Sequence, residues 1–405
     1  MMKDQYYLDN AATTWPKPET VYTTMDQFFR QYGVNPGRAG HEMAVEAERM
    51  ITETRRLLAG FFNHTGDPHR VVFTQNATDS LNTALFGLIN PGDHVITSRL
   101  EHNSVTRPTN HMARDLNVDV TQIQRDGEGY LDPEDIKKAI KSNTKVIVIN
   151  HASNVLGSVQ DIDAIGKIAR EAGVTFVLDS CQTAGVLDLD MERSCVDVMT
   201  FTGHKGLFGP MGIGGLVVGD NIDIRPARVG GTGVDSITPY QPDGYPYRLE
   251  AGTVSVPGIA GLNAAQKWFA ALGKEHLTDS KTFSHRELCV AALSHIEQKE
   301  VSHINKLANA FNAMDNVSVY GPKDNHPRVA TLSVNIDGLP ADQVGTMLDA
   351  DHYVCVRAGL HCAPWVHEDE GTVEQKGTVR FSPGYFADDD DLTQAIGGIL
   401  DIVEG

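Results

Sequence analysis

Residues 174–179 read Val-Thr-Phe-Val-Leu-Asp, and residues 197–205 read Asp-Val-Met-Thr-Phe-Thr-Gly-His-Lys. Each stretch is a short apolar run that ends in polar residues, which is typical of a buried strand in a parallel sheet. Similar runs lie upstream, separated by segments with helical spacing: Val71–Thr74, His94–Ser98 and Lys145–Asn150. This alternation predicts an α/β fold in which helices cover both faces of a mainly parallel sheet.

The pattern changes after Pro257, where longer helical segments and two strand-like runs, Ala330–Ile336 and Thr378–Ser382, follow. We expect a large domain over residues 15–257 and a smaller α+β domain formed by residues 1–14 and 258–405. A chain of 405 residues is long enough for two or three domains.

The overall charge argues against several classes of partner. Lys and Arg total 34 against 53 Asp and Glu, so the formal net charge is −19, which opposes binding to nucleic acid or to an anionic membrane. No apolar run approaches the length of about 20 residues that a membrane helix needs, and residues 1–10 do not resemble an export signal.

The 5 cysteines form no CxxC pair, which fits a reducing cytoplasm. No metal site is predicted.

Asp179 and Lys205 each follow the end of a predicted strand, and the carboxyl ends of parallel strands share one edge of the sheet. Either residue alone has an ordinary explanation, as a helix cap or as an exposed loop lysine. Together they match the needs of pyridoxal 5'-phosphate (PLP), whose aldehyde binds a lysine amine and whose pyridine nitrogen is held by an acid. Apolar neighbours such as Phe201 and Phe208 would lower the pKa of the lysine by desolvation.

A candidate phosphate site lies at residues 75–78, where a predicted strand gives way to a helix. Free backbone amides at the start of that helix, with the Thr78 hydroxyl, suit an anion. A polar helix cap after a strand is common, so this signal is weak alone.

Eight motifs in order give the chain a resemblance to the class V, fold-type I PLP-dependent enzymes, and within that class to the cysteine desulfurase and selenocysteine lyase family. They are YLDNAATT at 7–14, NPGR at 35–38, EHN at 101–103, HASNVLG at 151–157, DSCQ at 179–182, TGHK at 202–205, EAGT at 250–253 and RAGLHCAP at 357–364. The resemblance covers nearly the whole chain.

The resemblance implies the following roles. Lys205 binds the cofactor aldehyde, Asp179 holds the pyridine nitrogen, Gln182 contacts the ring hydroxyl, and His102 stacks on the ring and assists proton movement. The expected phosphate contacts are Ala77 through its backbone, Thr78, Thr202 and His204, with Thr253 supplied to the partner subunit of a homodimer. Asn154 is also expected beside the cofactor, and it binds the substrate carboxylate together with Arg357 and Arg380.

Cys362 lies in the RAGLHCAP motif, and the resemblance implies that its thiolate removes sulfur from L-cysteine. Arg357 and His361 are expected to supply the positive charge that favours a thiolate. The product would be L-alanine, with a persulfide on Cys362 for a protein acceptor.

Other reactions remain open at this point. Selenocysteine lyase, cysteine sulfinate desulfinase and an aminotransferase of the same class would use the same Lys205 and Asp179. A PLP-bearing scaffold that only transfers sulfur is a further alternative, which the combination of arginine, histidine and cysteine argues against.

Overall fold

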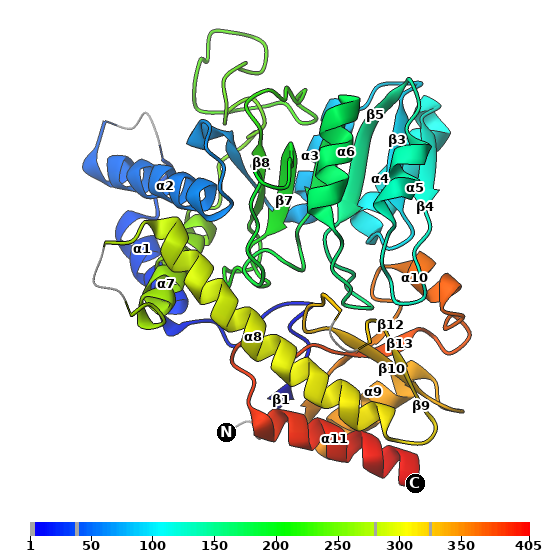
Figure 1. Ribbon diagram of the computed structural model, residues 1–405. Helices are drawn as coiled ribbons and strands as arrows, with labels where there is room; N and C mark the ends of the chain where they lie inside the picture. Colours follow the sequence, from blue (N-terminus) through cyan, green and yellow to red (C-terminus); the bar gives the residue numbers. More distant parts are fainter. Residues whose placement is uncertain (1–4, 37–39, 279–281, 324–325) are drawn as a thin grey trace.

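The computed structural model describes residues 5–36, 40–278, 282–323 and 326–405. A seven-stranded sheet forms its larger part, in the order β2-β8-β7-β6-β5-β3-β4 (Figure 1). The strands are β2 (Val71–Thr74), β3 (His94–Ser98), β4 (Asp119–Ile123), β5 (Thr144–Asn150), β6 (Thr175–Asp179), β7 (Val198–Thr202) and β8 (Gly214–Val218). Within the part of the chain that the structure describes, β8 is the one strand of this sheet that runs opposite to the other six, so the mainly parallel sheet predicted from the sequence is confirmed.

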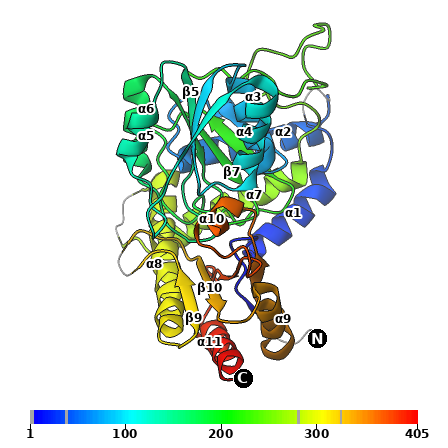
Figure 2. The same cartoon turned by 90° about the vertical axis from the view of Figure 1, so that its right-hand side faces the viewer.

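Helices cover both faces of this sheet (Figures 1 and 2). On β5, Val146 and Val148 pack with α3 (Ala77–Leu88) and α4 (Asn103–Leu116). Ile147 and Ile149 point the other way, into the core shared by α5 (Pro133–Ala139) and α6 (Ile162–Ala172). Successive side chains of the strand thus point to opposite faces of the sheet, and each face is buried under its own layer of helices.

Four further helices extend the second layer: α1 (Glu19–Tyr32), α2 (Glu42–Phe61), α7 (Val256–Glu275) and the first half of α8 (His285–Asn312). A short 3₁₀ helix (Pro68–Arg70) leads into β2. Helix α8 joins the two apolar cores of the protein, because Leu293 packs in the larger core and Leu307 in the smaller one.

The smaller core lies under an antiparallel sheet with the order β12-β13-β10-β9. Its strands are β9 (Val317–Tyr320), β10 (Leu332–Ile336), β12 (Arg357–Gly359) and β13 (Thr378–Phe381). Strand β1 (Tyr6–Tyr7) pairs with β11 (Val354–Cys355), and α9 (Ala341–His352) and α11 (Asp389–Glu404) complete this part. The short helix α10 (Pro364–Asp369) packs against the larger core through Val366. The predicted boundary at residue 257 stays a prediction; the two side-chain cores divide further along, within α8.

Among the described residues, no helix is long and apolar enough to cross a membrane.

Candidate active site

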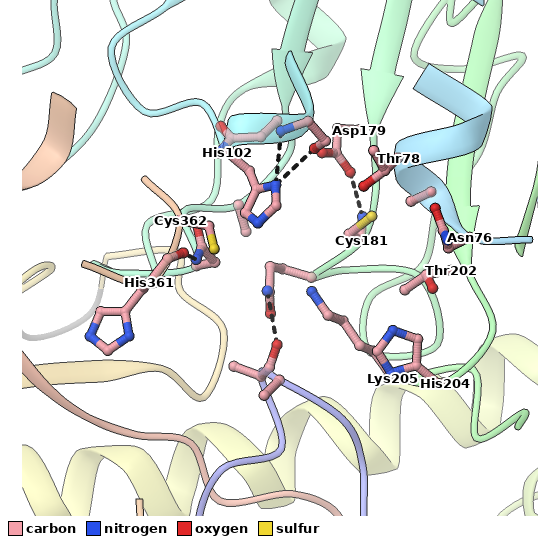
Figure 3. A pocket seen from close by; sticks show the side chains of 18 of the residues that line it. Asn76, Thr78, His102, Asp179, Cys181, Thr202, His204, Lys205, His361 and Cys362 are labelled. Atoms are coloured by element: carbon pink, nitrogen blue, oxygen red, sulfur yellow. Dashed lines mark hydrogen bonds between the residues drawn. The ribbon is translucent and has the colours of Figure 1, made fainter. Parts of the chain in front are cut away.

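A cavity of about 240 Å³ lies where β5, β6 and β7 end and where the smaller sheet approaches them (Figure 3). Its lining includes every predicted site residue except Thr253: Ala77, Thr78, His102, Asn154, Asp179, Gln182, Thr202, His204, Lys205, Arg357, Cys362 and Arg380. The cavity thus unites residues from both sheets, which are far apart in the sequence.

Asp179 is the last residue of β6, and its carboxylate is buried. One carboxylate oxygen, Oδ1, accepts a hydrogen bond from the backbone N–H of Cys181 at 3.0 Å. Gln182 lies in the same turn and donates from Nε2 to the carbonyl of Ala11 at 3.2 Å, which ties this turn to the N-terminal segment.

Lys205 follows β7, and its amine points into the cavity (Figure 3). Burial is the main cause that lowers the pKa of this amine, so a neutral, nucleophilic amine forms more readily. The backbone beneath it is held firmly, because the carbonyl of His204 accepts from the backbone N–H of Thr14 (3.1 Å), the Thr13 hydroxyl (3.0 Å) and the Lys17 amine (3.1 Å).

His102 caps the start of α4. Its Nδ1 accepts from the Ser104 backbone N–H at 3.1 Å and contacts the Ser104 hydroxyl at 2.8 Å. Burial, then the nearby Lys205, lowers the pKa of His102 to about 4. The ring is therefore neutral at pH 7, and its proton is on Nε2 because Nδ1 is an acceptor.

One end of the cavity is suited to an anion. Helix α3 begins there at Ala77, so its first backbone amides and the Thr78 hydroxyl are available. Within the described ranges, Thr202 Oγ1 and His204 Nδ1 are buried without a hydrogen-bond partner. A Cβ on Gly214 would lie 2.8 Å from Asn76 Cα, so the start of α3 can approach β8 only because residue 214 is glycine.

Thr253 is exposed and lies outside the cavity, in an adjacent hollow that Asn76 and His204 also line. Within a single chain, Thr253 therefore does not line the same cavity as the other predicted phosphate contacts. Its predicted role toward a partner subunit stays a prediction.

Arg380 and Asn154 form the wall near the smaller sheet. Arg380 is buried; its Nη2 donates to Asp9 Oδ1 at 2.7 Å and its Nη1 to the carbonyl of Asn154 at 3.1 Å. Arg357 lies opposite Arg380 on the neighbouring strand and is half exposed. Asn154 donates from Nδ2 to the carbonyl of His361 at 2.7 Å, which connects this wall to the Cys362 loop.

Cys362 is exposed at the edge of the cavity, across from Lys205 in Figure 3. Both His361 (φ 46°) and Cys362 (φ 57°) have left-handed backbone conformations, and the Cys362 carbonyl accepts from the Asn103 N–H at 2.7 Å. The expectation that His361 supplies positive charge is wrong. This ring is buried, and burial holds its pKa well below the ordinary value, so it is neutral.

Sequence reasoning missed Glu101, which is fully buried beside the site. Its Oε1 accepts from the Ser98 hydroxyl at 2.6 Å and from the Asn150 backbone N–H at 3.1 Å. Burial raises the pKa of Glu101 to about 8, and nearby Asp179 adds to this effect. The available signal was its place three residues after the end of β3, as the first residue of the EHN motif, to which the sequence analysis gave no role.

The model of one protein family, described as "Aminotransferase class-V", matches residues 6–394. The chain belongs to the class V aminotransferase family. Its similarity to other members extends over the full length. A protein of Methanothermobacter thermautotrophicus described as "Probable cysteine desulfurase" is 30% identical over 100% of this chain and 96% of its own length. A "Cysteine desulfurase" of Haloferax volcanii is 30% identical over 90% of this chain and 82% of its own length.

Among solved structures, the apo cysteine desulfurase from Thermococcus onnurineus NA1 superposes with a TM-score of 0.87 at 30% identity. The match covers 99% of this chain and 95% of that structure. This confirms the predicted fold class.

Proposed function

We propose that this class V protein is a PLP-dependent cysteine desulfurase, which converts L-cysteine to L-alanine and collects the sulfur as a persulfide on Cys362. The observation that carries the proposal is the content of one cavity: the Lys205 amine, the Asp179 carboxylate, the Arg380 guanidinium and the Cys362 thiol. The full-length similarity to cysteine desulfurases supports the same reaction.

The residues present fit PLP, the cofactor that family membership implies. Lys205 would bind its aldehyde, Asp179 its pyridine nitrogen, and Gln182 its ring hydroxyl. The unpartnered Thr202 hydroxyl and His204 ring nitrogen, with the start of α3, would hold its phosphate. When bound, this cofactor supplies an electron sink that makes bonds at the substrate α-carbon labile.

The chain's own side chains would carry out the remaining steps. Arg380 and Asn154, with Arg357 at the rim, would orient the substrate carboxylate. Lys205 would move the α-proton, and neutral His102 would exchange a proton at the substrate thiol through Nε2. An S–S bond would then form between Cys362 and the substrate sulfur as the substrate C–S bond breaks, leaving L-alanine.

The exposure of Cys362 supports transfer of its persulfide to an acceptor protein. A homodimer would bring Thr253 of one subunit toward the phosphate site of the other. All five cysteines are free in the structure, which supports a cytoplasmic location.

The purified protein tests this proposal directly. We expect a visible cofactor chromophore and equal amounts of L-alanine and sulfide from L-cysteine with a thiol reductant. Lys205→Ala should lose the covalent chromophore and the turnover, and Cys362→Ala should lose at least ~100-fold in rate on L-cysteine while keeping the chromophore. Cys355→Ala, which changes a cysteine outside the cavity, is the matched control and should stay active.

The same variants separate the alternatives. Selenocysteine and cysteine sulfinate need less help from a thiol, so Cys362→Ala would retain those activities if one of them were the main reaction. Full turnover of L-cysteine by Cys362→Ala would refute the assignment of Cys362.

A further inference from the structure

Two guanidinium groups lie side by side at the substrate end of the cavity. Arg357 and Arg380 occupy directly opposed positions on antiparallel β12 and β13, an arrangement in which like charges repel. Asp9 bridges them: its Oδ1 is 2.7 Å from Arg380 Nη2, and its Oδ2 is 4.0 Å from Arg357 Nη1.

The backbone fixes Asp9 in this place. Residues on either side of it bond to Ser382, which follows β13: the Ser382 N–H donates to the Leu8 carbonyl at 2.7 Å, and the Asn10 N–H donates to the Ser382 carbonyl at 3.1 Å. Asp9 therefore moves with the strand that carries Arg380. It does not line the cavity, whereas both arginines do, so its carboxylate lies behind them.

The charges of this cluster can be counted. Two guanidinium groups and one carboxylate leave a net charge of about +1. Tyr7 and His361 add none, because burial raises the pKa of Tyr7 to about 12 and lowers that of His361 well below its ordinary value. Within the described chain, the buried Nε–H of Arg380 has no acceptor, so the contacts with Asp9 and Asn154 do not use all the donors of this guanidinium.

We propose that Asp9 is a specificity-determining residue. Its negative charge lowers the positive charge at the substrate end of the cavity to about +1, which one substrate carboxylate balances. This inference rests on the proposed function, in which Arg380 binds the substrate carboxylate. One carboxylate neutralises the cluster, and a second anionic group on the same small molecule gains little. Asp9 thus favours L-cysteine over amino acids with an acidic side chain, such as cysteine sulfinate.

Binding of two unreactive anions tests the proposal. Propionate and succinate carry one and two carboxylates and have no amine to react with the cofactor, so their affinities for the purified holoenzyme can be measured by calorimetry. In Asp9→Asn we expect succinate to bind on the order of tenfold more tightly, and propionate only about threefold more tightly. In the same variant, the kcat/KM for cysteine sulfinate should rise relative to the kcat/KM for L-cysteine.

Two variants serve as controls. Asp9→Glu keeps the charge and should keep the wild-type preference between the two anions. Asp26→Asn removes a carboxylate from an exposed ion pair with Arg30 on α1 and should change neither affinity. Equal weakening of both anions in Asp9→Asn would show that Asp9 only positions Arg380, and an unchanged succinate-to-propionate ratio would also overturn the proposal. Because the calorimetry needs no turnover, it stays readable even if L-cysteine is not the substrate.

Discussion

At the scale of single residues, the acid–base state of the site depends on a carboxyl group that never reaches the cavity. Glu101 accepts two hydrogen bonds through Oε1, and the buried Asp179 carboxylate lies nearby. Two ionised carboxylates this close in a buried region would repel each other. The pKa of about 8 for Glu101 means that it is mostly protonated at neutral pH and adds no full negative charge beside Asp179.

We expect this proton to make stability depend on pH. Unfolded Glu101 loses its proton near its ordinary pKa of 4.5, and folded Glu101 near 8. Between these values the folded state holds more protons, so raising the pH removes up to ~1.4 kcal/mol of unfolding free energy per pH unit. Glu101→Gln has no proton to lose at this position. The unfolding free energy of Glu101→Gln minus that of the wild type should therefore increase from pH 5 to pH 8 in urea unfolding experiments.

Glu134→Gln is the matched control, because Glu134 is exposed on α5. Its unfolding free energy should follow the wild-type pH profile. Parallel profiles for Glu101→Gln and wild type would contradict the protonated state of Glu101.

The sequence supports the prediction of some site residues better than others. Asp179 and Lys205 could be paired from the residues alone, because parallel strands deliver their carboxyl ends to one edge. Cys362 and Arg380 were found only through the family resemblance, since their position depends on how the smaller sheet packs against the larger one. Asp9 was missed because its importance lies in a contact with Arg380, 371 residues away along the chain.

At the scale of secondary-structure elements, a buried ion pair closes the open edge of the large sheet. Arg55 on α2 forms two 2.8 Å hydrogen bonds with the Glu250 carboxylate and also donates to the Val71 carbonyl. Glu250 accepts from the Phe73 N–H at 2.7 Å. These two side chains satisfy a carbonyl and an N–H on the free edge of β2, the backbone groups that a neighbouring strand would otherwise bind. The contacts lie just before α3 begins.

We expect Arg55→Met to lose about 3–5 kcal/mol of unfolding free energy, because it leaves the Glu250 carboxylate buried without its partner. The double variant Arg55→Met/Glu250→Leu should recover part of this loss, because it no longer buries an unpaired charge. It should remain about 1–3 kcal/mol less stable than the wild type, since the Phe73 N–H loses its acceptor. Arg30→Met breaks an exposed ion pair and should leave the free energy of unfolding close to that of the wild type. Denaturant titrations of the four proteins give these values, and a double variant less stable than Arg55→Met would contradict the account.

The elements that the sequence did not predict have a physical explanation. Strand β8 begins with Gly214 and Gly215, and glycine weakens the signal of a strand. Here the glycines allow close approach, since a Cβ on Gly215 would lie 2.5 Å from the Phe201 ring. The end of helix α6 shows the opposite case, because Gly173 follows its last residue and caps it in the left-handed conformation (φ 67°), which is a common glycine signal for a helix end.

At the scale of the whole molecule, residues 226–244 form no helix or strand; they lie in the light green loop that projects at the top of Figure 1. Three apolar side chains along this segment are largely exposed: Val229 (72%), Ile237 (96%) and Tyr240 (81%). Exposure of three large apolar side chains on one segment favours a role for that segment in an interface. The segment leads directly to Thr253, which is also exposed.

We expect the protein to be a homodimer in which this segment covers part of the partner subunit. Ile237→Glu would place a charge in that interface and should weaken the dimer at least ~10-fold in sedimentation velocity experiments. Leu400→Glu, which introduces the same charge at a partly exposed position on α11, should leave the dimer intact. If Thr253 completes the partner's phosphate site, Ile237→Glu should also release the cofactor more readily on dilution than Leu400→Glu does. A wild-type protein that stays monomeric at micromolar concentration and retains its cofactor would contradict both expectations, because one chain would then hold the phosphate with α3, Thr202 and His204 alone.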